Sequence, residues 1–593
     1  MPVRTKIWSL RIYRGRLCFL VIIEERGRNV VKKDSLIKGT IILTVAALVA
    51  RFLGLFQRIP LVYLLGNEGM ASYTIAFNLY STLLIIATAG VPTALSKMIS
   101  EKMAVGHYQD ARKIYRASLW FAVIAGIVMA VMLYILAPFY AEDISRDPHA
   151  VLATQAIAPA LLLFPLIAIM RGYFQGRQRM MPNGISQVVE QILRLVVGVL
   201  LAYLLLNVSL EWGIAGASLG GVAGGVAALA VMIYYTVKIR EEDKEELPSI
   251  AVQRSDGSIS YTKEAGLSDP GITLSYGSIL RDLLSLSIPI VIFSMTVTLI
   301  YNIDSSTVIP FLTRFTDTPY QEAKELLGIL GGQAQSLAGL PIVLAVALSQ
   351  SIMPIISVAY SQGKMDVVAN QTAKVLQLSI ISGLPMVLLI CTGSRPIDGF
   401  IFLFGGSEIG NQFAPSIIAL MTASVMFQII MQTSGAVLMG MGKMPELVQI
   451  VAIGIGTKMV SSIMLVKYLG IYGIIAGSAL CFVIMSYLNL RVLHKEVKFR
   501  IMLKRRWVGL AFSTIIIVAV GMMLEIVTDT YLHLTPWVRF NYGLNAVIIC
   551  GAVMALYPIM LVVTRVVTWN DVLSFPAPLQ KLIHKAARIL KRS

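Results

Sequence analysis

Two arginines lie inside an apolar stretch that is long enough to cross a membrane. Residues 39–66 read GTIILTVAALVARFLGLFQRIPLVYLLG, with Arg51 and Arg58 as the only charged side chains. A membrane helix needs roughly 20 residues, so both arginines fall within the span. Seven residues are nearly two turns, which places both guanidinium groups on one helix face, about 10 Å apart. Arginines at this depth indicate a wet or anionic site, and pairing with carboxylates of other helices is the alternative.

Four more charged residues occur at membrane depth, and we treat them as candidates for a cavity or an ion-coupling site. Glu190 and Arg194 are four residues apart, so the alternative is that they neutralise each other on one helix face. Asp304 has polar neighbours, which is typical of a cation or proton site and also of a satisfied helix end. Lys458 could line a cavity or extend its ammonium group to the membrane surface.

The chemistry of these residues favours an anionic substrate. Arginine donates paired hydrogen bonds to phosphate oxygens, and the first span carries no carboxylate. We therefore predict Arg51 and Arg58 as substrate-binding residues, with a lipid-linked pyrophosphate sugar as a fitting ligand. The sequence has no phosphate-binding loop and no metal-spaced histidine cluster. We expect no enzymatic activity, no cofactor and no metal site.

The composition indicates which elements position these residues. Of the 593 residues, 56% are hydrophobic and 14% charged, and the mean hydropathy is +0.76. These values exclude a soluble protein with a single core and indicate a polytopic membrane protein. The formal charge of +18 resides largely in loops between apolar segments, as membrane topology requires, and nucleic-acid binding is not expected.

Apolar windows of about 19 residues predict an all-α polytopic membrane protein with about fourteen transmembrane helices. Loops rich in Lys and Arg alternate with neutral or acidic loops, which places both termini in the cytoplasm. The predicted spans are 39–64, 72–96, 117–138, 152–170, 184–206, 213–237, 283–311, 333–358, 371–393, 412–440, 445–466, 471–490, 508–527 and 542–564.

An internal repeat divides the chain into two parallel six-helix lobes followed by two more helices. Three separate stretches in the first half match stretches 257 to 263 residues further on; one pair begins MPNG at Met181 and MPEL at Met444. Parallel lobes around a shared site are a recurrent transporter design. The predicted parts are an N-terminal extension (1–33), the N-lobe (34–238), a cytoplasmic linker (239–282), the C-lobe (283–492), the last two spans (493–568) and a tail (569–593).

The two ends of the chain differ from the rest. The extension is basic, and its apolar run is too short to span a membrane; we expect the natural chain to begin near Val31. The tail places apolar residues at helical spacing with lysines and arginines largely opposite them. This pattern is typical of a helix lying on an anionic membrane surface, and equally of a solvated helix.

From about residue 33 onward the sequence resembles the polysaccharide-transporter branch of the multidrug/oligosaccharidyl-lipid/polysaccharide exporter superfamily. It is most similar to the group of stage V sporulation protein B and YtgP, which are MurJ-like lipid II flippases. Arg51-Phe52-Leu53-Gly54 matches the first half of an arginine pattern that contacts pyrophosphate in such flippases. The resemblance implies residence in the bacterial plasma membrane and flipping of undecaprenyl-pyrophosphate-linked glycans, lipid II in particular, by alternating access.

Two other functions remain open at this stage. An antiporter for drugs or cations in the same superfamily, coupled to H⁺ or Na⁺, would depend on a carboxylate such as Glu190 or Asp304. A non-transporting scaffold for spore or cell-wall assembly would need none of the charged residues in the spans. A flippase would depend on the arginines of the first span, so substitution of these residues separates the three functions.

Overall fold

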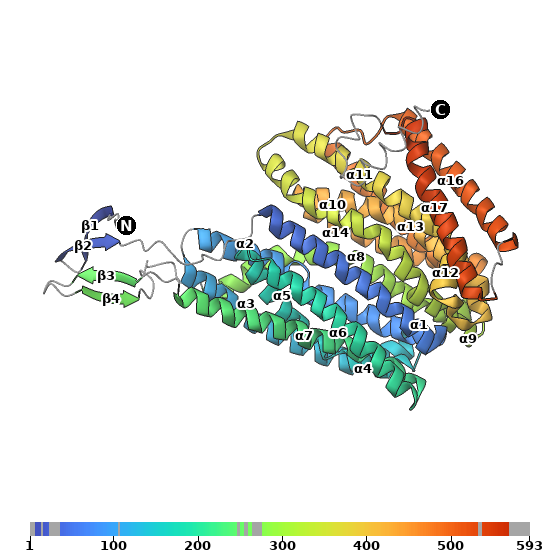
Figure 1. The fold of residues 1–593 in the computed structure, drawn as a ribbon, viewed down its shortest axis with the longest axis horizontal. Coiled ribbons are helices and arrows are strands. Elements are labelled where there is room, and N and C mark those ends of the chain that lie inside the picture. The colour runs from blue at the N-terminus through green and yellow to red at the C-terminus, as the bar shows by residue number, and fades with distance from the viewer. Residues whose placement is uncertain are drawn as a thin grey trace.

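Long apolar helices that run side by side make up most of the molecule (Figure 1). The computed structural model describes residues 6–13, 16–22, 36–104, 107–245, 249–253, 259–263, 275–531 and 536–567. Within these ranges, thirteen helical segments are long and apolar enough to cross a membrane. The predicted fold class, an all-α polytopic membrane protein, is confirmed.

The first of these segments, Val45–Ala104, contains two predicted spans. Helix α1 (Leu36–Thr88) is interrupted at Gly66, where φ is 64° and ψ is −178°. This backbone conformation is open to glycine and strained for other residues. After the bend the second half of α1 runs back beside the first half. Ile85 in the second half therefore lines the same cavity as Arg51 in the first. Counting the two halves of α1 separately gives the fourteen spans that the sequence predicts.

The remaining elements of the first half follow in order. A π-helical turn, η1, continues α3 and ends at the connection to α4. The elements are α2 (Val91–Ala104), α3 (Tyr108–Pro138), η1 (Phe139–Ile144), α4 (Ala150–Ile157), α5 (Ala160–Gly176), α6 (Met181–Leu206) and α7 (Leu210–Glu245).

The second half contains more short elements between its long helices. It consists of α8 (Tyr276–Phe315), α9 (Tyr320–Gly328), the π-helical turn η2 (Ile329–Ala334), α10 (Gln335–Ser361), α11 (Met365–Thr392), α12 (Ser394–Ile401), the 3₁₀ turn η3 (Leu403–Gly406), α13 (Glu408–Gly440), α14 (Met444–Leu469) and α15 (Ile471–Glu496). Two further helices, α16 (Lys504–Tyr531) and α17 (Val538–Val563), pack against each other and against α11.

The internal repeat is visible in where the helices begin. Helices α6 and α14 each start at the methionine of a Met-Pro pair, and each is 26 residues long. Each then packs closely on the next helix, α7 or α15. Two parallel six-helix lobes and two C-terminal helices are therefore present. The limits predicted for the domains stay a prediction, and α7 and α8 both extend into the predicted linker 239–282.

Four strands, which were not predicted from the sequence, form a small sheet apart from the helices (Figure 1). They are β1 (Lys6–Tyr13), β2 (Arg16–Ile22), β3 (Ser249–Gln253) and β4 (Ile259–Lys263), paired antiparallel in the order β1-β2-β3-β4. The N-terminal extension and the linker both contribute strands. The proposed start near Val31 and the predicted amphipathic tail, 569–593, lie outside the described residues.

The helix bundle has two chemically different ends. We call the end with the connections α2–α3, α5–α6 and α15–α16 the basic end, since Lys and Arg are abundant in these connections or in the helix ends beside them. The opposite end, with the Gly66 bend and the connections α3–α4 and α8–α9, is the acidic end. The largest buried apolar cluster joins the two halves toward the acidic end and includes Leu61, Met70, Leu330 and Ile417. The halves are therefore packed together there.

Candidate functional site

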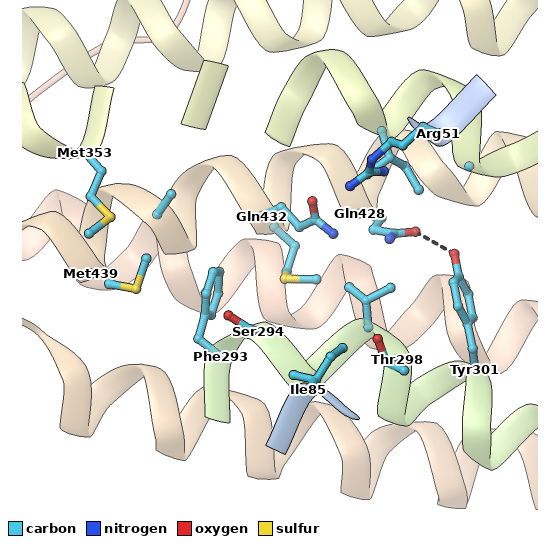
Figure 2. A pocket seen from close by; sticks show the side chains of 15 residues that line it. Arg51, Ile85, Phe293, Ser294, Thr298, Tyr301, Met353, Gln428, Gln432 and Met439 are labelled. Carbon is cyan, nitrogen blue, oxygen red and sulfur yellow. Dashed lines mark hydrogen bonds between the residues drawn. The ribbon is translucent and has the colours of Figure 1, made fainter. Parts of the chain in front are cut away.

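A cavity of about 500 Å³ lies between α1, α8, α10 and α13, so both halves of the molecule form its wall (Figure 2). Polar side chains gather in its middle, while Met353, Met439 and Phe293 lie further toward the basic end (Figure 2). The described lining residues are Arg51, Ile85, Phe293, Ser294, Val297, Thr298, Tyr301, Gly339, Ile342, Met353, Gln428, Met431, Gln432, Ala436 and Met439.

Arg51 is the charged residue among these lining residues. Its guanidinium group points into the cavity (Figure 2), and the structure shows no hydrogen bond or ion pair to it within the described part of the chain. A cation at membrane depth without a protein counter-charge is costly unless water or a ligand contacts it. Arg51 therefore lines the cavity, and its predicted role in substrate binding stays a prediction.

Arg58 lies in a different environment from Arg51. Its Nη1 donates a hydrogen bond of 3.1 Å to the Gly331 carbonyl of η2. The guanidinium carbon also lies 5.2 Å from the ring centre of Tyr73 and 5.1 Å from that of Phe77. Cation–π contacts stabilise a desolvated guanidinium. In this structure Arg58 therefore links α1 to the second half of the chain, and its predicted role in substrate binding stays a prediction.

Glu190 and Arg194 do contact each other, as the alternative interpretation of their spacing requires. Arg194 Nη2 lies 3.2 Å from Glu190 Oε1, and Arg171 Nη2 lies 3.0 Å from Glu190 Oε2. The carboxylate of Glu190 is buried between these two arginines. The sequence does not single out Arg171, because its contact with Glu190 crosses from α5 to α6. The cluster holds the N-lobe helices together.

Asp304 and Lys458, which the sequence presents as two separate candidates, form one buried ion pair. The Lys458 Nζ also donates to the Ile474 carbonyl at 2.8 Å, and Ser478 Oγ donates to Asp304 Oδ2 at 3.0 Å. Lys458 is completely buried, and Asp304 is 4% exposed. The pair therefore joins α8, α14 and α15 within the C-lobe. A role in H⁺ or Na⁺ coupling stays a prediction.

At the acidic end a buried polar cluster connects the two halves. Asp147, between η1 and α4, forms an ion pair of 2.8 Å with Lys324 of α9. Its carboxylate also accepts hydrogen bonds from Ser72 at 2.5 Å and Tyr320 at 3.1 Å. The sequence singles out neither Asp147 nor Lys324, since their pairing depends on the approach of the two halves.

Asn67, next to the Gly66 bend, makes a second connection at this end. Its side chain donates to the Phe404 carbonyl at 3.3 Å and to Ser407 Oγ at 3.0 Å, and it accepts from Gln333 Nε2 at 2.9 Å. The backbones also touch, because a Cβ added at Gly328 would lie 1.8 Å from the Asn67 carbonyl oxygen. The acidic end is thus closed by apolar, polar and backbone contacts.

The fold and the cavity between two repeated lobes define a membrane transporter architecture. Residues 36–360 match the model of the family described as "Polysaccharide biosynthesis protein", and the chain belongs to this family. It is 26% identical to the lipid II flippase MurJ of Bacillus subtilis strain 168 over 502 residues, which cover 82% of this chain and 88% of the relative. It is 27% identical to stage V sporulation protein B of the same organism, over 59% of this chain and 64% of that protein.

Solved structures agree on the fold. The inward closed conformation of the lipid II flippase MurJ superposes with a TM-score of 0.62 at 14% sequence identity. The alignment covers 88% of this chain and all of that structure. The predicted membership of the exporter superfamily is confirmed, and the chain is a multi-pass membrane protein with many apolar helices.

Proposed function

We propose that this chain moves an undecaprenyl-pyrophosphate-linked glycan, with lipid II as the substrate, from the cytoplasmic to the outer leaflet by alternating access. One observation carries the proposal: Arg51 points into a cavity formed by both halves and has no counter-charge within the described residues. Pyrophosphate oxygens would accept the paired hydrogen bonds that a guanidinium group donates. The likeness to the lipid II flippase MurJ supports this choice of headgroup.

The two ends of the bundle give the proposed transport a direction. From the positive-inside rule we infer that the basic end, and both termini, face the cytoplasm. The structure then represents a state closed toward the outside, with the cavity reaching toward the cytoplasm as far as Met353 and Met439. Outward opening would separate the contacts of Asp147 and Asn67. In the same proposal the guanidinium group of Arg58 first breaks its hydrogen bond to the Gly331 carbonyl and then contacts the headgroup.

The alternative of a cation or drug antiporter receives less support. Among the lining residues that the structure describes, none is Asp or Glu. Glu190 and Asp304, the carboxylates that such an antiporter would use, each have basic partners. A membrane scaffold would not need a cation in a cavity at all. Transport of an anionic headgroup is therefore the function that fits this site best.

The test is lipid II translocation in cells depleted of their own flippase and expressing this chain. We expect the wild type to restore translocation and Arg51→Ala to abolish it at equal protein level. Arg491→Ala removes an exposed arginine at the end of α15 and serves as the matched control. Absence of translocation by well-expressed wild type would contradict lipid II as the substrate, and full activity of Arg51→Ala would contradict the anion site.

A further inference from the structure

Gln428 of α13 is a completely buried amide on the wall of the cavity, only partly hydrogen-bonded. Its Oε1 accepts a hydrogen bond of 3.1 Å from the hydroxyl of Tyr301 on α8. Its Nε2 has no hydrogen-bond partner within the described part of the chain. A buried N–H group without a partner is uncommon in native proteins and calls for a specific explanation.

The Tyr301 hydroxyl determines which end of the amide faces the cavity. An amide presents an acceptor oxygen on one side and two N–H donors on the other. Because the hydroxyl donates to Oε1, the Nε2 end is turned away from Tyr301 and toward the middle of the cavity, where Gln432 and Arg51 also lie (Figure 2). A contact from α1 also fixes the position of Tyr301, since Asn78 Nδ2 donates a hydrogen bond of 3.2 Å to the Tyr301 backbone carbonyl.

Arg51 and the Nε2 end of Gln428 both offer only hydrogen-bond donors to the cavity. A cation beside an oriented amide N–H is a suitable environment for an anion with several acceptor oxygens, and unsuitable for a cationic ligand. Such an anion would satisfy the buried Nε2 and neutralise the guanidinium group at the same time. Phosphate and pyrophosphate groups have this chemistry, whether a lipid carries them or they are free in solution.

We infer that Gln428 is a second anion-binding residue, which contacts the phosphate oxygens together with Arg51, and that Tyr301 is the positioning residue that orients its amide. This inference rests on the proposed function. Arg51 belongs to α1 and Gln428 to α13, so the ligand contacts both lobes. A ligand that binds both lobes in one arrangement stabilises that arrangement relative to the others.

The experiment measures binding to the purified full-length protein in lipid nanodiscs with three probes: lipid II, undecaprenyl phosphate and inorganic pyrophosphate. We expect Gln428→Glu to weaken binding of the anion at least tenfold, because a carboxylate replaces the donor and repels phosphate. Gln428→Leu, which removes the hydrogen bond without adding charge, should weaken it by roughly tenfold, the value of one hydrogen bond to a charged group. Gln412→Glu adds the same charge at an exposed position of α13 and should bind like the wild type.

Tyr301→Phe keeps the ring and removes the hydroxyl that orients the amide. We expect a few-fold weaker binding from this change alone, and no further weakening when it is combined with Gln428→Leu. This non-additivity would show that Tyr301 acts through Gln428, whereas a general packing role would weaken binding in both backgrounds.

The outcomes separate this inference from the proposed function. If the wild type binds lipid II, and Gln428→Glu and Gln428→Leu bind it equally well, the inference about Gln428 is overturned and the proposed function is not. If the wild type binds lipid II and not pyrophosphate, and both variants lose the binding of lipid II, a lipid headgroup is supported as the source of the anion. Binding of pyrophosphate, lost in both variants, supports the anion contact with a free anion as a ligand. Wild type that binds none of the three probes would overturn both proposals.

Discussion

The Lys324 ammonium group lies 2.8 Å from the Asp147 carboxylate, and this buried ion pair connects the two halves of the molecule at the acidic end. Asp147 is completely buried and Lys324 is 2% exposed. Removing one partner of a buried pair leaves an uncompensated charge, which is much more costly than losing an exposed pair. The pair is therefore well placed to keep the acidic end closed.

Lys324→Met should open this end. Thr74, completely buried next to Gly331, can be replaced by cysteine as a reporter in a chain without its four native cysteines. We expect labelling of Thr74→Cys by a membrane-impermeant maleimide in intact cells to rise about tenfold with Lys324→Met, equivalent to about 1.4 kcal/mol. Lys443→Met, which breaks the more exposed pair with Glu496 at the basic end, is the control. Equal labelling in all three backgrounds would contradict the closing role of Lys324.

Replacing both Lys458 and Asp304 should cost the protein little stability, whereas replacing either residue alone should cost much. Lys458→Met leaves the Asp304 carboxylate buried without its cation, and Asp304→Asn leaves the ammonium group without its anion. Each single change should destabilise the protein by about 3–5 kcal/mol. The double variant should recover most of this loss, as measured by thermal unfolding of the purified protein. A double variant whose loss equals the sum of the two single losses would mean that the pair does not act as a unit.

Gly328→Ala should prevent the halves from approaching at the acidic end. The new Cβ would lie 1.8 Å from the Asn67 carbonyl oxygen, so α9 and the Gly66 bend would have to move apart. We expect a loss of about 1–3 kcal/mol in stability. Gly456→Ala in α14 is the matched control, because a Cβ there meets nothing within 4 Å. If both variants unfold at the wild-type temperature, the close backbone contact is not required.

Asp398 of α12, outside the membrane-spanning segments, should make stability depend on pH. Its carboxyl group is completely buried, and neither oxygen has a hydrogen-bond partner within the described residues. Burial raises the pKa of Asp398 well above its usual value of 3.8. The folded protein then binds the proton more tightly than the unfolded chain, so this group favours folding below about pH 4. That contribution is lost as the pH rises through the folded-state pKa.

Asp398→Asn keeps the size of the side chain and removes its charge. We expect the variant to unfold at a higher temperature than the wild type at pH 8 and at the same temperature at pH 4. Asp143→Asn changes an exposed carboxylate at the same end and should alter neither value. A wild type that is as stable as Asp398→Asn at pH 8 would show that the buried carboxylate has a partner in solution.

Hydropathy and the internal repeat were sufficient to predict the membrane fold, because long apolar segments have few alternative structures in a bilayer. The depth of Arg51 within its span likewise indicated a residue of the cavity. Pairing between helices could not be predicted in the same way. Asp304 and Lys458 belong to helices far apart in the sequence, and Arg58 meets Tyr73 and Phe77 only because α1 bends back at Gly66.

Gln428 and Tyr301 were missed for a related reason. Neutral polar residues in apolar helices carry little signal by themselves, since many of them bond to their own backbone. The small sheet was missed because its strands come from two segments far apart in the sequence, the N-terminal extension and the linker. Sequence patterns thus identified the costly charges, while the neutral partners around them appear only once the helices are packed.

The π-helical turn η2 also determines which residues of α10 face the cavity. Hydrogen bonds from i to i+5 accommodate one more residue per turn than the α-helical pattern. Each residue of an α-helix advances the side chains by about 100°, so everything after η2 is rotated by about that angle relative to an uninterrupted α-helix. Gly339 and Ile342 line the cavity in this arrangement. Without the extra residue, α10 would present a different set of side chains to the cavity.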